Sequence, residues 1–254
     1  MSSDHTYDLA GLPDGATLRS VTAQPVVIDG RPALQVQLTD QVALHGVPDV
    51  DYVDQPTFVV VPADFTTGTI EVDLRAGLTS TAPDYARGFA GIAYHLVGGG
   101  DRFEAVYLRP LNGASLNPPA PRHLRAVQYF AYPDWKYQRL RDTYPEGVYE
   151  TGADIRPDTW VHLELTITSS ATTVTVNGAE LVTIESKVSP TRGPVGLFVD
   201  IGTRACFANL KIITDSPRSR PLGRVTPATS DDARPGQPGS PSDEQSGDSR
   251  RGHP

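Results

Sequence analysis

Hydrophobic and polar residues alternate along most of the chain before position 215, in short runs separated by turn-forming residues. The segment 68–78, GTIEVDLRAGL, places Ile70, Val72 and Leu74 on one face and charged or hydroxyl side chains on the other. A period of two is typical of a β-strand with one buried face. The sequence therefore predicts a strand here, with its apolar side toward the core.

Two dipeptides typical of tight turns divide other alternating segments into hairpins. Asp29-Gly30 separates two apolar runs within 25–40, and Asn177-Gly178 does the same within 171–186. Asp-Gly and Asn-Gly favour two-residue hairpin turns because both positions accept a positive φ. Further strands are expected over 55–65, 88–97, 102–111, 126–132, 159–168, 193–202 and 204–213.

About twelve candidate strands at short spacing, with no convincing amphipathic helix, predict an all-β protein. The expected architecture is an antiparallel, two-sheet jelly-roll β-sandwich. Residues 1–20, which lead into the first hairpin, are expected to be irregular or to form an edge strand. The proline-rich segment 112–122 is excluded from a central strand because proline lacks the N–H that a ladder requires. Segment 133–142, PDWKYQRLRD, is expected to be a long loop, where binding residues often gather.

The composition changes from Asp215 onward. Residues 215–254 contain almost no large apolar side chain and are rich in proline, glycine, serine and alternating charges. Such a segment buries too little apolar surface to offset the entropy lost on ordering. The sequence therefore predicts a β-sandwich domain over 1–214 and a disordered tail over 215–254.

Charge and composition limit the classes of partner. The formal net charge of −8 argues against a nucleic-acid-binding protein, which would need a basic surface. No stretch reaches the roughly eighteen apolar residues of a membrane span, and the N-terminus lacks the pattern of a secretory signal. The single cysteine, Cys206, lies in an apolar run and has no intramolecular disulfide partner. These features predict a cytoplasmic protein with no membrane partner and leave the oligomeric state open.

Aromatic and cationic residues are concentrated between positions 123 and 150. Tyrosine, tryptophan and arginine alternate there, in a chain that is otherwise poor in aromatics and net acidic. Aromatic faces stack on sugar rings, and planar guanidinium groups hydrogen-bond the polar rim of a ligand. The alternative is that the rings belong to the core and the arginines to a solvated edge. We favour a ligand site for the cluster as a whole.

Taken together, the predicted strand segments between residues 68 and 213 resemble the concanavalin A-like lectin and glucanase superfamily, most closely its bacterial laminin G-like and 3-keto-disaccharide hydrolase-like members. The resemblance spans roughly residues 55–213 and is most specific at Gly193–Leu197 and Phe207–Ile212, which have the forms G-x-V-G-L and F-x-N-L-K-I. It implies two curved antiparallel sheets, with ligands on the concave sheet or the loops at its rim. It does not name a function, because the superfamily holds lectins, hydrolases, lyases and inert binding modules on one scaffold.

Polar residues at strand positions or strand ends are the candidates for a ligand groove. A carboxylate among arginines has a lowered pKa, which suits an orienting group or a base, and Glu150 is the preferred catalytic candidate of this kind. Glu150 can also simply pair with Arg139 or Arg141. The predicted ligand-binding residues are Arg109, Asn112, Gln128, Tyr129, Tyr132, Trp135, Arg139, Arg141 and Tyr149.

Other catalytic and metal-binding patterns fit less well. Glu71 and Asp73 have the spacing of paired carboxylates on a strand, but Ala76 and Gly77 stand where laminarinase-like proteins carry a third one. No Ser-His-Asp order, phosphate loop or Cys/His metal spacing occurs. The oxygen-rich run DVDYVD at 49–54 is a candidate for a structural calcium ion, although it lacks the spacing of a defined calcium loop. No other cofactor is expected.

These features favour the binding of a carbohydrate or another small-molecule ligand, such as a small glycoside, in a groove lined by aromatics and arginines. Two alternatives stay open. The first is a carbohydrate-active enzyme, hydrolase-like or lyase-like, that uses the same groove. The second is a protein-interaction scaffold, because Tyr, Trp and Arg are also typical of interfaces. Binding ranks first because the sequence names no complete acid/base pair.

Overall fold

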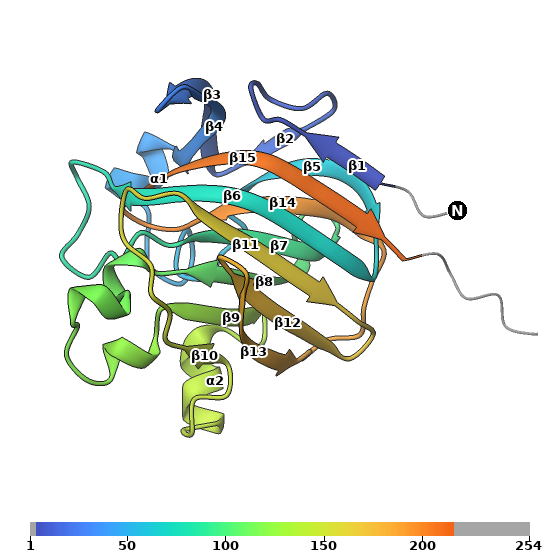
Figure 1. The fold of residues 1–254 in the computed structure, drawn as a ribbon. Helices are drawn as coiled ribbons and strands as arrows, with labels where there is room; N and C mark the ends of the chain where they lie inside the picture. Colours follow the sequence, from blue (N-terminus) through green and yellow to red (C-terminus); the bar gives the residue numbers. More distant parts are fainter. Residues whose placement is uncertain (1–3, 216–254) are drawn as a thin grey trace, which may run out of the picture. The chain divides into compact units, whose positions relative to one another are not determined.

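The computed structural model describes residues 4–215, which form two antiparallel β-sheets packed face to face (Figure 1). One sheet has eight strands in the order β13-β12-β11-β6-β15-β4-β3, with β1 added beside β15. The other has seven strands in the order β10-β9-β8-β7-β14-β5-β2. The all-β, two-sheet sandwich that the alternation predicts is therefore confirmed.

The strand bounds place the two sheets along the chain. The eight-stranded sheet contains β1 (Asp4–Tyr7), β3 (Val21–Ile28), β4 (Arg31–Leu38), β6 (Gly68–Leu78), β11 (Val161–Ile167), β12 (Ala171–Val176), β13 (Ala179–Glu185) and β15 (Thr203–Thr214). The seven-stranded sheet contains β2 (Thr17–Arg19), β5 (Phe58–Phe65), β7 (Ala90–Val97), β8 (Arg102–Leu108), β9 (Val127–Tyr132), β10 (Glu150–Thr151) and β14 (Gly193–Val199). Apart from Asp215, the predicted disordered tail lies outside the described residues.

The two turn dipeptides form hairpins, as their chemistry predicts. Asp29 and Gly30 join β3 to β4 with φ values of 53° and 78°, and Asn177 and Gly178 join β12 to β13 with 51° and 80°. A positive φ at both central positions matches the right-handed twist of the flanking strands. These turns set the register of the two hairpins.

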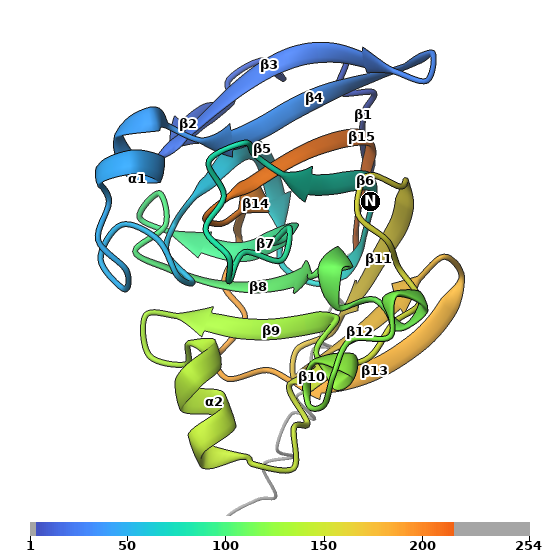
Figure 2. The same cartoon turned by 90° about the vertical axis from the view of Figure 1, so that its left-hand side faces the viewer.

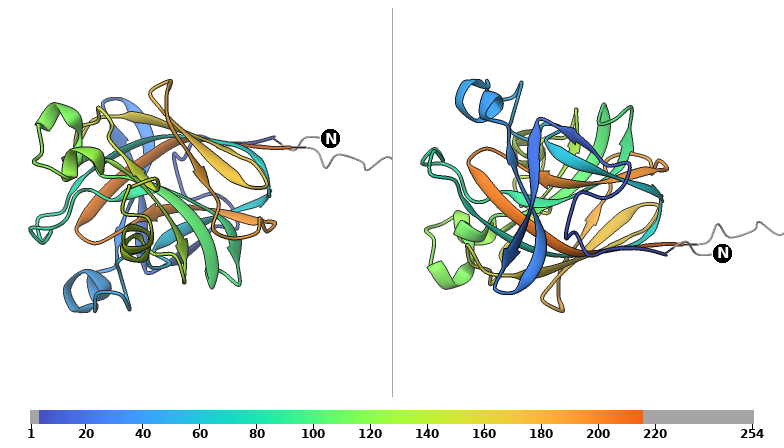
Figure 3. Two further views of the ribbon diagram at one scale, coloured as in Figure 1. Left: turned by 90° about the horizontal axis from the view of Figure 1, so that it is seen from below. Right: turned by 90° about the horizontal axis from the view of Figure 1, so that it is seen from above.

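Short helices interrupt the strands, which the sequence pattern did not predict. The helix α1 (Asp40–His45) buries none of its residues and projects from the sandwich in both views of Figure 3. The helix α2 (Tyr137–Thr143) buries only Leu140 and lies against β9 (Figure 2). Both are too short to show a helical hydrophobic repeat. The segment 133–142 therefore ends in a helix, whereas the sequence predicts a loop. Three 3₁₀ turns, η1 (Pro110–Asn112), η2 (Ala114–Leu116) and η3 (Arg122–Leu124), follow β8.

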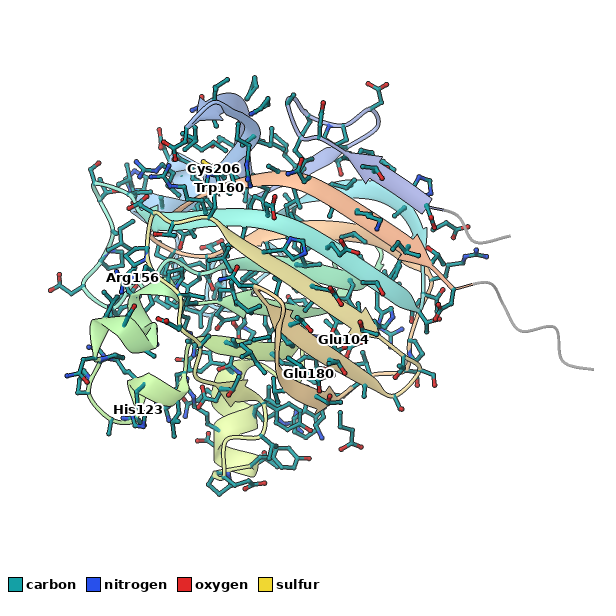
Figure 4. All side chains as sticks on the ribbon, in the orientation of Figure 1. Glu104, His123, Arg156, Trp160, Glu180 and Cys206 are labelled. Carbon is teal, nitrogen blue, oxygen red and sulfur yellow. The ribbon has the colours of Figure 1, made fainter. Side chains whose placement is uncertain are left out.

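The core between the sheets contains the apolar faces that the alternation predicts. In β6, Ile70, Val72 and Leu74 are fully buried, whereas Glu71 and Asp73 on its outer face are half-buried. The hydroxyl of Tyr94 in β7 lies 2.8 Å from that of Thr172 in β12, so the two sheets also touch through polar groups. At one end of the first sheet, Cys206 is buried beside Trp160, as Figure 4 shows.

A hydrogen-bonded histidine and glutamate lie inside this core. Nδ1 of His95 is 2.6 Å from Oε2 of Glu104, and the hydroxyl of Tyr129 donates to Oε1 of Glu104 at 2.6 Å. Nε2 of His95 is 2.6 Å from the carbonyl oxygen of Thr66, an acceptor, so this nitrogen carries a proton. Polar groups are tolerated in a protein core when each of them is hydrogen-bonded. Tyr129 therefore belongs to a polar network within the core.

The outer face of the seven-stranded sheet is lined with aromatic rings. Tyr107, Phe130 and Phe198 come from β8, β9 and β14, with ring centroids 5.4–5.9 Å apart. The segments around Asp54 and Tyr137 meet at this face, where the backbone N–H of Tyr137 donates to Oδ2 of Asp54 at 2.6 Å. The candidate functional site lies beside this contact.

Candidate functional site

A pocket of about 330 Å³ lies where β8 and β14 end and β7 and β9 begin. Arg109 and Asp200 directly follow β8 and β14, and Phe89 directly precedes β7. Because neighbouring strands are antiparallel, the end of one strand lies beside the start of the next, so these positions meet at the same end of the strands. The lining contains five arginines (Arg87, Arg109, Arg122, Arg125 and Arg141), four aromatic rings (Tyr85, Phe89, Tyr107 and Tyr137), and also Asp54, Asp200 and Asn112.

Arg109 is the most enclosed cation of the pocket. Its Nη2 donates to the Tyr107 hydroxyl at 2.8 Å and to Oε1 of Gln128 at 3.1 Å. Its Nη1 lies 3.5 Å from Oε2 of Glu150. Burial opposes its charge, but Tyr107, Glu150 and Asp54 more than offset this effect and raise the pKa of Arg109. Arg109 is thus a permanent cation whose orientation is fixed by its neighbours.

Glu150 holds three guanidinium groups in place. Besides Arg109, it accepts from Nε of Arg125 at 2.8 Å and from Nη2 of Arg141 at 2.6 Å. Its side chain is only 7% exposed and lies beside the pocket rather than in its lining. With both carboxylate oxygens engaged by arginines, Glu150 is placed to position them, and the role of base predicted from the sequence stays untested.

Two buried carboxyl groups lie opposite the arginines. Asp200 accepts from the backbone N–H groups of Val53, Asp54 and Ile201 at 2.7–3.0 Å, yet burial raises its pKa. For Asp54, burial raises the pKa to about 7, the N–H of Tyr137 acts to lower it, and the charge of Asp200 raises it. Asp54 therefore carries a proton for part of the time at neutral pH.

Two acceptor oxygens in the pocket have no partner. Oδ1 of Asp54 and Oδ1 of Asn112 are both buried, and neither has a partner with hydrogen-bond geometry among residues 4–215, although the Tyr107 hydroxyl is near enough to Asp54 to lower its pKa slightly. The other amide atom of Asn112, Nδ2, donates to the carbonyl oxygen of Arg125 at 2.9 Å, which fixes the orientation of the amide. Buried acceptors without partners are rare in folded proteins and are expected to find a donor from water or a ligand.

The structure brings together five of the residues predicted from the sequence. Arg109, Asn112 and Arg141 line the pocket, and Gln128 and Glu150 contact Arg109. Arg109 and Gln128 meet because Arg109 directly follows β8 and Gln128 lies on the neighbouring strand β9, opposite Tyr107. Whether these residues bind a ligand stays a prediction.

The other predicted residues, Tyr129, Tyr132, Trp135, Arg139 and Tyr149, lie outside the lining of the pocket. The guanidinium of Arg139 stacks on Trp135, 4.2 Å from its ring centroid. Tyr132 stacks on Phe103, and Tyr149 packs on Tyr129, whose hydroxyl is bound to Glu104 in the core. None of these lines the pocket. The aromatic walls of the pocket come instead from Tyr85, Phe89, Tyr107 and Tyr137.

Sequence reasoning missed Asp54, Asp200 and the arginines at 87, 122 and 125 as pocket residues. Asp200 had a local signal, because it is a lone carboxylate at the end of an apolar run. Asp54 belongs to the run DVDYVD that we considered for calcium. Its acidic groups separate in the structure: Asp51 accepts from the N–H of Val47 at 2.8 Å, and Asp49 lies 3.8 Å from Nζ of Lys136. In 4–215 no group of three or more His, Cys, Asp or Glu residues could hold a metal ion, and the structural calcium ion suggested for this run stays a prediction.

Comparisons with known proteins support no family assignment. No protein-family model and no curated protein matches the sequence. Among solved structures, a Bacillus subtilis protein of unknown function with a galectin-like fold has 12% identity, covers 84% of this chain and 98% of its own, and has a TM-score of 0.49. Carbohydrate-binding module CBM66 from Bacillus subtilis has 11% identity, coverage of 76% and 96%, and a TM-score of 0.46.

A third similar structure is domain 4 of AbnA, a GH43 extracellular arabinanase from Geobacillus stearothermophilus, in complex with arabinotriose. It has 11% identity, covers 83% of this chain and 90% of its own, and has a TM-score of 0.45. With TM-scores below 0.5, these likenesses carry no argument about function. The evidence for the β-sandwich that the sequence resemblance implies is the pair of sheets in the structure itself. Among residues 4–215 there is no helix of the length and hydropathy needed to cross a membrane. The predicted cytoplasmic location and the predicted absence of a nucleic-acid partner stay predictions.

Proposed function

We propose that this protein binds a carbohydrate or small glycoside in the pocket between Arg109, Asp54 and Tyr137. The observation that carries the proposal is the pair of unpartnered acceptors, Oδ1 of Asp54 and Oδ1 of Asn112, in a pocket that also presents guanidinium donors. A sugar hydroxyl donates one hydrogen bond and accepts others, so it can serve both kinds of group at once. The scaffold alternative has no comparable supporting observation.

The size and walls of the pocket support a small sugar. A volume of about 330 Å³ lies at the lower end of the range of small-ligand pockets. Tyr137 has a guanidinium over its ring, that of Arg141 at 4.8 Å from the centroid. Phe89 and Tyr107 meet edge to face, with centroids 6.0 Å apart. Aromatic rings of this kind pack against the C–H face of a pyranose while its rim is hydrogen-bonded.

Tyr137→Ala is expected to weaken sugar binding by about tenfold, because it removes a wall of the pocket but keeps the backbone N–H that donates to Asp54. Isothermal titration calorimetry with a panel of mono- and disaccharides measures the change. The matched control is Trp135→Ala, which removes an aromatic ring of the same segment outside the pocket, and it should change affinity less than about twofold. Loss of binding in Trp135→Ala with retention in Tyr137→Ala would move the site to the Trp135 surface.

An enzyme acting in the same pocket is a second candidate, favoured by the environment of Asp54. Glycoside hydrolysis requires an acid that protonates the departing oxygen while water attacks the sugar carbon. A carboxyl group with a pKa of about 7 and a free Oδ1 suits that role better than Glu150, which is held by three arginines.

Under this second candidate, Asp54→Asn is expected to lower turnover by about a hundredfold or more while sugar affinity changes little, because asparagine keeps the shape but holds no acidic proton. Turnover is measured with a panel of nitrophenyl glycosides, and affinity by calorimetry. If the wild-type protein turns over none of these glycosides yet binds sugars, the binding function stands without catalysis.

A further inference from the structure

The arginines of the pocket outnumber the carboxyl groups that could neutralise them. Five guanidinium groups line it, against Asp54 and Asp200 in the lining and Glu150 beside it. Glu150 is shared by Arg109, Arg125 and Arg141. The pocket therefore carries a local excess of positive charge, although the chain as a whole has a net charge of −8.

Two of these arginines form no ion pair with a carboxylate of residues 4–215. Arg87 donates only to backbone carbonyl oxygens, those of Asp84 at 2.7 Å and Ala86 at 2.6 Å. The side chain of Arg122 forms no hydrogen bond or ion pair with any residue of the described part of the chain. Both guanidinium groups thus keep donors available for a ligand.

The two arginines also repel each other. Burial lowers the pKa of Arg87, the positive charges of Arg122 and Arg109 lower it further, and the charge of Asp84 offsets only part of this effect. Like charges held together are unfavourable, and an anion bound between the two guanidinium groups would reduce the repulsion. Guanidinium groups bind carboxylate and phosphate oxygens in pairs of parallel hydrogen bonds, which makes them the preferred side chains for such anions.

From this geometry we infer that the pocket is selective for sugars that carry an anionic group, which Arg87 and Arg122 bind while the hydroxyls reach Asp54 and Asn112. The group is a carboxylate, as in a uronic acid, or the ester phosphate of a sugar phosphate. The uronic acid and the sugar phosphate both carry a compact anionic group on a hydroxyl-rich sugar ring. The inference rests on the proposed carbohydrate binding and narrows its ligand.

The test compares matched sugars on the intact protein by calorimetry at fixed ionic strength. The probes are glucose, glucuronate and glucose 6-phosphate, together with galactose and galacturonate. We expect at least one anionic sugar to bind about tenfold or more tightly than its neutral counterpart. The uronates and the sugar phosphate are titrated separately. The anionic sugar with the higher affinity shows whether the pocket prefers a carboxylate or a phosphate.

Arg122→Gln is expected to reduce this preference to about twofold or less, with a clearly larger loss of affinity for the anionic sugar than for the neutral one, because glutamine keeps hydrogen-bonding capacity but not charge. Arg139→Gln is the matched control, since Arg139 stacks on Trp135 outside the pocket, and it should keep the full preference. Equal affinity for neutral and anionic sugars, or equal loss of both in Arg122→Gln, would overturn the inference and leave carbohydrate binding intact. Binding of none of the probes would overturn the carbohydrate proposal and this inference with it.

Discussion

Replacing Glu150 by alanine is expected to lower the free energy of unfolding by about 3–5 kcal/mol and to remove sugar binding. The carboxylate lies within 3.5 Å of Arg109 and within 2.8 Å of Arg125 and Arg141. Without it, the guanidinium of Arg109, whose side chain is 6% exposed, keeps its charge but loses a counter-charge in a buried site. Removing one member of a buried ion pair is costly because the remaining charge stays uncompensated.

Urea denaturation measures the stability change, and calorimetry with the best-binding sugar measures the loss of affinity. Glu180→Ala is the matched control, because Glu180 is an exposed residue of β13 (Figure 4), and it should change stability by less than about 0.5 kcal/mol. If Glu150→Ala were as stable as Glu180→Ala, the carboxylate would not be the anchor of the arginine cluster. If Glu150→Gln lost turnover but kept full stability and affinity, Glu150 would act as a base instead.

Replacing Asp54 by asparagine is expected to remove a loss of stability that the wild-type protein shows between about pH 4 and pH 7. Burial raises the pKa of Asp54 from its ordinary value of 3.8 to about 7. As the pH rises through this interval, the unfolded chain releases the proton while the folded protein still holds it, so folding becomes less favourable. The accumulated penalty is about 4 kcal/mol and is complete above pH 7.

Asparagine has no charge to bury and still offers an oxygen to the N–H of Tyr137. The stability of Asp54→Asn relative to wild type should therefore rise by about 4 kcal/mol between pH 4 and pH 8. Urea denaturation of both proteins at these two pH values measures this difference. An equal difference at both pH values would show that folding does not raise the pKa of Asp54, which would also remove its role as an acid.

The fold could be predicted from the sequence because its signals are local. The alternation in 68–78 matches β6 residue for residue, and Asp29-Gly30 and Asn177-Gly178 mark hairpins through their own backbone preferences. The helices α1 and α2 escaped prediction, because segments of six and seven residues are too short to show a helical repeat. The strands β1 and β2 lie in the segment 1–20, for which the sequence predicts only an irregular or edge-strand structure.

The site could be predicted only in part, because it is assembled from distant segments. Arg109, Gln128 and Glu150 were expected near one another, and the pairing of β8, β9 and β10 does bring them together. The aromatic stretch 123–150 contributes Tyr137 to the pocket, whereas its residues Trp135 and Tyr149 pack with Arg139, Tyr129 and Lys187. A role of Trp135 and Tyr149 in ligand binding stays a prediction. Asp54 meets Tyr137 across a separation of 83 positions, which no local pattern encodes.

We expect a sugar to bind in the pocket at the ends of β8 and β14. Nuclear magnetic resonance tests this most directly, by following the backbone amide signals of the labelled protein during titration with the tightest-binding sugar. The amide signals of Asp54, Tyr137 and Ile201 should shift, because these N–H groups donate to the carboxylates of the pocket. The amide of Tyr137 donates to Asp54, and those of Asp54 and Ile201 donate to Asp200. Shifts confined to the surroundings of Trp135 and Lys187, with none at these three amides, would contradict the account.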